Sequence, residues 1–189
     1  NEILEIAAGE SINYASVNKL GTFRTDSTYL QRHINKILEL PLVDIKSIRS
    51  KKFKIVVDAV NSSGGVVVPM LLRNLGVEEI IEIHCEPNGE FAHNPEPLPE
   101  HLNDLSKKVK KENAHLGIAV DPDVDRLAFV SEDGEPFGEE YTLVAVSDYV
   151  LKHQHGRNTV SNLSSTRALN DVTLKHGGKY FASAVGEVN

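Results

Sequence analysis

Three aspartates stand at alternate positions directly after a short apolar run in the segment GIAVDPDVDRLAF, residues 117–129. The carboxylates of Asp121, Asp123 and Asp125 are close enough along the chain to repel one another unless something offsets their charge. Mg²⁺ prefers such hard oxygen ligands, and carboxylates two positions apart on a turn converge on one ion while the residues between them point away. Together with Arg126, they predict a Mg²⁺ site rather than a solvated turn with an Asx cap.

Two other kinds of site contain aspartates at this spacing. An EF-hand Ca²⁺ loop counted from Asp121 places Glu132 at its twelfth position, but it needs glycine at the sixth, where this chain has Arg126. A haloacid-dehalogenase-like phosphatase also carries Asp-x-Asp at a strand end, where the first aspartate attacks phosphate. That alternative needs a lysine and an acidic pair further along the same domain, and it stays open. A non-catalytic module that keeps the loop as a structural ion site also stays open.

The composition of the 189 residues is that of a globular protein, with 40% hydrophobic and 25% charged residues. The formal net charge of −7 argues against a nucleic-acid partner or an anionic membrane, because both need a basic surface. A single cysteine, Cys85, excludes an internal disulfide and suits the reducing cytoplasm. No run predicts a membrane span or a signal peptide, and the first residue is not methionine, so we expect a fragment of a longer protein.

Strand-like and helix-like segments alternate along the middle of the chain, which predicts an α/β fold with a mixed, largely parallel sheet. In chain order the expected elements are a strand at 53–60, a helix at 64–76, a strand at 79–86, a helix at 98–113, a strand at 115–121, and a strand at 126–131 that pairs with 134–138. The three aspartates therefore lie where a buried strand ends.

Further units flank this region. An N-terminal helix is expected at 26–40, capped by Asp26 or Ser27, with an apolar stripe formed by Leu30, Ile34, Ile37 and Leu38. After Pro136 we expect a helix at 139–154, with Leu143, Val146 and Val150 on its apolar face, then a strand at 158–163, a helix at 165–177 and a strand at 179–185.

Two loops at strand ends are candidates for binding. Residues 86–100 contain four prolines and predict a stiff surface loop where α/β folds place binding residues, although a connector without a role stays open. Within it, His93 could face the cleft. We interpret Asp58, at the end of the first strand, as a loop tie rather than a catalytic group. The NSSGG segment at 61–65 could cradle a phosphate but lacks the lysine of a P-loop, so we favour a tight strand-to-helix turn.

The aspartate segment and its continuation, GIAVDPDVDRLAFVSEDGEPFGEEYTLVAV, closely resemble the metal-binding loop and following domain entry of the α-D-phosphohexomutase superfamily. This family includes phosphoglucomutase/phosphomannomutase and phosphoglucosamine mutase. KIVVDAVNSSGG resembles the opening of the family's second domain, and NGEFAHNPEPLPEHL, NLSSTRALNDV and AVGEVN extend the similarity over most of the chain.

The resemblance implies a four-domain enzyme that interconverts 1-phospho and 6-phospho hexoses through a phosphoserine and a bisphosphorylated sugar. It implies Asp121, Asp123 and Asp125 as Mg²⁺ ligands and Arg126 as the catalytic cation beside the phosphoryl group. The family's serine loop is absent from the sequence, so we expect the chain itself to be inactive. The implied parts are the end of domain one at 1–48, all of domain two at 49–138 and a truncated domain three at 139–189.

The resemblance also places two candidate substrate contacts in the third part. Arg167 lies in a segment similar to the family's sugar site, although a surface charge on a helix is an open alternative. Glu187 stands where mannose-type members carry histidine and glucosamine-type members often carry an acid, which leans toward the glucosamine or archaeal-like branch. The hexose therefore stays undecided among glucose, mannose and glucosamine phosphates. A truncated third domain would leave apolar faces exposed, so we expect the residues after about 138 either to be poorly ordered or to self-associate with a second copy.

Overall fold

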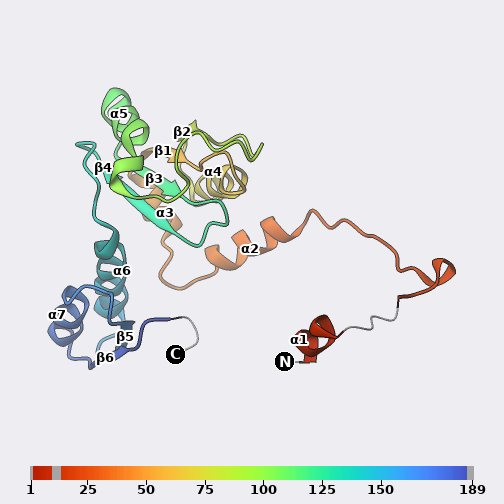
Figure 1. Ribbon diagram of the computed structural model, residues 1–189. Coiled ribbons are helices and arrows are strands. Elements are labelled where there is room, and N and C mark those ends of the chain that lie inside the picture. Colours follow the sequence, from red (N-terminus) through yellow and green to blue (C-terminus); the bar gives the residue numbers. More distant parts are fainter. Residues whose placement is uncertain (1, 10–13, 187–189) are drawn as a thin grey trace.

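The computed structural model describes residues 2–9 and 14–186. Its central feature is a four-stranded sheet (Figure 1) with the order β2-β1-β3-β4. The strands are β1 (Lys54–Asp58), β2 (Glu79–Ile83), β3 (Leu116–Val120) and β4 (Leu127–Ser131). Strand β1 runs parallel to both β2 and β3, whereas β4 runs antiparallel to β3. The predicted mixed, largely parallel α/β sheet is thereby confirmed.

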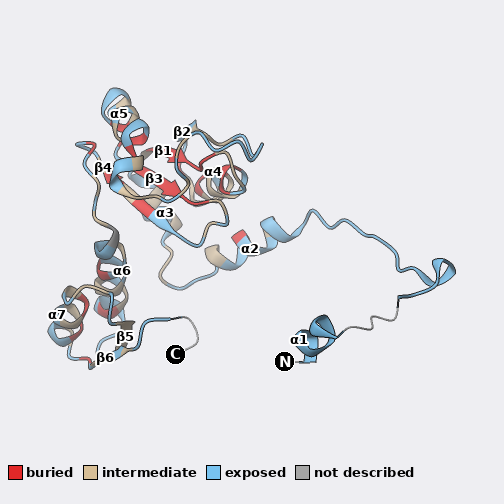
Figure 2. Cartoon of the chain, viewed as in Figure 1, coloured by how far each residue is buried: buried red, intermediate tan, exposed pale blue. Residues whose placement is uncertain are grey.

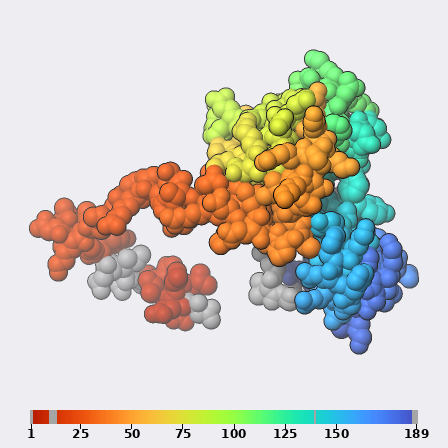
Figure 3. Space-filling model, turned by 180° about the vertical axis from the view of Figure 1, so that it is seen from behind, coloured from red at the N-terminus to blue at the C-terminus, as the bar shows by residue number. Residues whose placement is uncertain are grey.

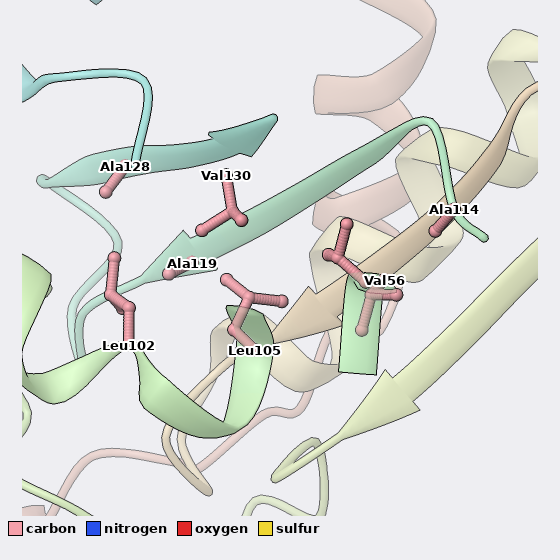
Figure 4. Packing of buried hydrophobic residues seen from close by; sticks show 8 residues of the cluster. Val56, Leu102, Leu105, Ala114, Ala119, Ala128 and Val130 are labelled. Carbon is pink, nitrogen blue, oxygen red and sulfur yellow. The ribbon is translucent and has the colours of Figure 1, made fainter. Parts of the chain in front are cut away.

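Helices cover the two faces of this sheet, because successive side chains of a strand point to opposite faces. On one face, α4 (Gly64–Leu75) packs where Ile55 and Val57 point. On the other, α5 (Asn103–Glu112), preceded by the short helix η2 (Pro99–His101), packs Leu105 against Val56 (Figure 4). The alternation along β1 thus divides the core into two layers, one covered mainly by α4 and the other by α5.

The segment that precedes helix α2 extends away from the sheet (Figures 1 and 3). Helix α1 (Glu2–Ala8) and the short helix η1 (Val17–Lys19) have no buried residues (Figure 2). Helix α2 (Tyr29–Leu38) packs on α4 and buries Ile34 of its expected stripe, and α3 (Ile45–Ser50) leads into β1. Neither predicted cap side chain caps α2: its N-cap residue is Thr28, whose N–H donates to Asp26 Oδ1 at 2.8 Å.

The third unit contains α6 (Glu139–His153), β5 (Thr159–Asn162), α7 (Ala168–Lys175) and β6 (Tyr180–Ser183), with β5 and β6 paired in parallel. The predicted inward stripe of α6 is wrong, since Leu143 and Val146 are exposed and Val144 and Leu151 are buried. Helix α6 is apolar around much of its surface, so periodicity alone does not select the face that packs on α7. No helix in the described parts of the chain is both long and apolar enough to cross a membrane.

Candidate functional site

The turn between β3 and β4 brings the three aspartates together. We call residues 121–126 the aspartate loop. One carboxylate oxygen from each of Asp121, Asp123 and Asp125 lies within 4.8 Å of the other two. Asp121 directly follows β3 and is buried, with 6% of its surface exposed, whereas Asp123 and Asp125 are exposed. The loop therefore presents one inner and two outer oxygen donors at the end of the sheet.

Hydrogen bonds inside the aspartate loop fix its path. The Arg126 N–H donates to Asp121 Oδ1 at 3.0 Å, and the Val124 N–H donates to the Asp121 carbonyl at 3.2 Å. Val124 adopts a φ of 63°, a left-handed conformation that is costly for a β-branched residue. Such a conformation persists only where the surrounding structure enforces it. Asp121 and the neighbouring turn supply that constraint.

The NSSGG turn at the start of α4 supports the aspartate loop from outside. The hydroxyls of Ser62 and Ser63 both donate to the Pro122 carbonyl at 2.8 Å. Gly64 is required beside them, because a Cβ there would collide with Val120 and approach Val124. Sequence reasoning found this turn but missed its role as a support. The partners are separated by about sixty residues, so no local pattern connects them.

Electrostatics in the aspartate loop favour a bound cation. A hydrogen bond with Asp121, followed by the negative charge of Asp123, raises the pKa of Asp125, and the nearby Arg126 guanidinium acts in the opposite direction. Closely spaced carboxylates hold protons more tightly because ionising all of them brings like charges together. A divalent cation relieves this repulsion, and an all-oxygen donor set suits Mg²⁺. The residues present therefore fit the predicted ion.

Arg126 joins the aspartate loop to residues 86–100, which we call the proline loop. Its Nη1 lies 2.6 Å from Glu96 Oε1, and its Nε lies 4.0 Å from Asp125 Oδ1. A hollow of about 300 Å³ lies between the loops and is lined by Asn94, Pro95, Glu96, Asp121, Pro122 and Arg126. A guanidinium beside oxygen donors for a divalent cation is suited to binding a phosphate ester.

A polar pair anchors the proline loop to the sheet. Asp58, at the end of β1, has 1% of its surface exposed, and its Oδ2 lies 3.1 Å from His93 Nε2. The other ring nitrogen, Nδ1, lies 2.8 Å from the Asn94 carbonyl oxygen. Asp58 Oδ1 also accepts a hydrogen bond from the Val60 N–H at 3.1 Å. Asp58 thus ties a loop in the structure, as the sequence interpretation expected, and its partner is His93.

Arg167, one of the two candidate substrate contacts, is not part of this hollow. Arg167 precedes α7 in the third unit; its side chain is 87% exposed, and its Nε lies 4.0 Å from Asp171 Oδ1. Helix α7 lies apart from the sheet that carries the aspartate loop (Figure 1). Glu187 lies outside the described residues.

Comparison with protein families gives a match over the part of the chain that forms the sheet and its helices. The family model described as phosphoglucomutase/phosphomannomutase, alpha/beta/alpha domain II, matches residues 31–134. This range covers more than half of the chain and includes the aspartate loop, the proline loop and the NSSGG turn.

Individual relatives extend the similarity beyond that range. A probable phosphoglucosamine mutase of Methanopyrus kandleri is 33% identical over the whole chain, which covers 40% of that relative. A phosphoglucomutase/phosphomannomutase of Thermococcus kodakarensis is 31% identical over 97% of the chain, again covering 40% of the relative. The chain therefore spans well under half the length of these two relatives.

Solved structures show the same fold. A phosphoglucomutase/phosphomannomutase family protein of Burkholderia thailandensis superposes with a TM-score of 0.72 and 29% sequence identity, over 83% of this chain and 33% of that one. A putative phosphomannomutase of Thermus thermophilus gives a TM-score of 0.76 over 88% of this chain and 38% of that one, at 23% identity. At that identity the second match supports the fold alone.

Proposed function

The chain belongs to the phosphoglucomutase/phosphomannomutase family, and from this premise we propose that it forms part of a mutase that interconverts 1-phospho and 6-phospho hexoses. The observation that carries the proposal is the convergence of Asp121, Asp123 and Asp125 beside Arg126. In this proposal residues 1–48 end the first domain, 49–138 form the second and 139–189 begin the third. We place the reaction in the cytoplasm.

The proposed reaction moves a phosphoryl group between a serine elsewhere in the enzyme and the sugar. The bond from phosphorus to the serine oxygen breaks as a bond to a sugar hydroxyl oxygen forms, giving a bisphosphorylated sugar, and the serine then recovers phosphate from the other end. Asp121, Asp123 and Asp125 would hold Mg²⁺, which offsets negative charge on the transferring group when bound. Arg126 would bind phosphoryl oxygens through its guanidinium.

The sequence left two alternatives open, a phosphatase and a non-catalytic metal-binding module. Membership of the mutase family leaves the haloacid-dehalogenase-like phosphatase without support. A non-catalytic metal-binding module is the remaining competitor, and an assay with glucose, mannose and glucosamine phosphates distinguishes it. Arg167 and Glu187 stay proposed substrate contacts of the third unit, and the same assay identifies the hexose.

The proposal predicts the effect of Asp123→Asn in the complete mutase. Loss of one metal ligand removes transition-state charge stabilisation, so kcat should fall by roughly a hundredfold or more. Stability should change little, because Asp123 is exposed. The matched control is Glu132→Gln, an exposed acid just beyond β4, which should leave kcat unchanged. The metal-ligand role would be abandoned if Asp123→Asn kept normal kcat at saturating Mg²⁺.

A further inference from the structure

The backbone of Glu96 is held by neighbours on both sides along the chain. Its N–H donates to Asn94 Oδ1 at 3.1 Å, and its carbonyl oxygen lies 2.8 Å from His101 Nδ1. Pro95 and Pro97 flank it and restrict the backbone on either side. The carboxylate of Glu96 is therefore presented at a defined place.

Buried Asp58 also fixes the proline loop to the sheet, through His93. His93 stands three residues before Glu96, and its ring lies between the Asp58 carboxylate and the Asn94 carbonyl, with both nitrogens facing acceptors. His84 packs edge-on against this ring, with the ring centroids 5.6 Å apart. The proline loop is thus fixed to the end of β1 at one point and reaches the aspartate loop at another.

The Glu96–Arg126 pair is poorly explained by stability. Its side chains are 47% and 54% exposed, and exposed ion pairs contribute little to folding free energy. The pair instead contacts two sides of the guanidinium: Glu96 binds Nη1, and Asp125 lies 4.0 Å from Nε. Within the described parts of the chain, Nη2 forms no hydrogen bond or ion pair. One nitrogen of the fork is therefore left for an incoming anion.

We propose that Glu96 is a positioning residue for Arg126, holding its guanidinium at the hollow beside the aspartate loop before phosphate arrives. The proposal rests on the proposed mutase function and adds a residue to it. A long side chain such as that of Arg126 loses conformational entropy when it becomes ordered. If it is mobile before phosphate binds, this free-energy cost weakens binding and slows the reaction. Glu96 reduces that cost because the ordering is already present in the unliganded protein. Asp58 and His93 support Glu96 indirectly, because they fix the proline loop to the sheet.

A double-mutant cycle in the complete mutase tests this role. Glu96→Ala should lower kcat roughly three- to tenfold, the cost of ordering one released side chain, with a smaller change in KM. In an Arg126→Ala background the same change should have no further effect, because a residue that acts through Arg126 has nothing left to position. Glu100→Ala, an exposed acid of the same loop, is the control and should match the wild type. An unchanged kcat in Glu96→Ala, or an equal loss in both backgrounds, overturns the proposal.

A second readout does not depend on activity. In the 189-residue chain, nitrogen-15 relaxation of the Arg126 side-chain Nε–H should report a restrained group in the wild type and in Glu100→Ala, and a more mobile group in Glu96→Ala. Equal mobility in all three overturns the positioning role. If the complete wild-type protein lacks mutase activity, the proposed function fails by itself, whereas the relaxation data still decide whether Glu96 holds Arg126.

Discussion

At Asp125 the negative charges of the aspartate loop act on an exposed side chain. Its pKa is raised from the ordinary value of 3.8 by a hydrogen bond with Asp121 and by the charge of Asp123. The sequence places all three aspartates at equal spacing, so it predicts a cluster but does not identify which carboxyl has a raised pKa. The hydrogen bond between Asp125 and Asp121 depends on the folded turn, in which the buried Asp121 also accepts the Arg126 N–H.

This raised pKa predicts a pH-dependent effect of Asp125→Asn on the metal-free chain. Because the folded state binds the Asp125 proton more tightly than the unfolded state does, ionisation of Asp125 lowers the free energy of unfolding. This loss of stability is complete above the raised pKa and absent below 3.8. Asparagine cannot ionise and still offers a donor to Asp121. In EDTA, the variant should melt at a higher temperature than the wild type at pH 7 and at the same temperature near pH 3. A gain that persists unchanged at pH 3 would contradict the assignment.

At the scale of elements, the strands and helices of the sheet unit follow from local patterns, but their supports do not. Alternating and continuous apolar runs in the sequence predict β1 to β4 and α4. The antiparallel pairing of β4 with β3 and the hydroxyls of Ser62 and Ser63 on Pro122 are contacts between separate segments. These contacts depend on how the segments pack together, which the hydrophobic periodicity of a single segment does not predict.

Gly65 shows how closely the NSSGG turn approaches its neighbour. A Cβ at this position would collide with the backbone carbonyl of Cys85, which cannot move without shifting the end of β2. Gly65→Ala should therefore destabilise the chain by about 1–3 kcal/mol in urea unfolding, the usual range for overpacking. Gly21→Ala is the control, because nothing lies within 4 Å of the added atom. Equal stability of the two variants would show that α4 can shift freely.

The whole molecule has a well-packed sheet unit, a smaller third unit and an extended N-terminal part (Figures 1 and 2). In the third unit Val160, Leu163 and Phe181 are more than half exposed. The sequence predicted the type and order of elements here but not the buried face of α6. The sheet of the third unit has only two strands. It therefore offers little surface that would determine which face of α6 becomes buried.

These units should differ in protection from hydrogen exchange. Amides of β1, which is paired on both sides and buried in the core, should exchange through near-global unfolding. Amides of β6, paired on one side in the described part of the chain, should exchange faster in dilute monomer. Higher protein concentration should slow exchange in β6 if this face associates with a second copy. Strong and equal protection of both strands in a proven monomer would contradict the proposed domain division.

The central claim is that the aspartate loop holds a divalent cation, and paramagnetic Mn²⁺ tests it most directly, because Mn²⁺ takes the same oxygen ligands as Mg²⁺. Substoichiometric Mn²⁺ should broaden the backbone amide signals of residues 121–126 first, and excess Mg²⁺ should restore them. The triple variant Asp121→Asn, Asp123→Asn, Asp125→Asn should lose this broadening. Broadening centred on another part of the chain, or persisting at the aspartate loop in the triple variant, would contradict the account.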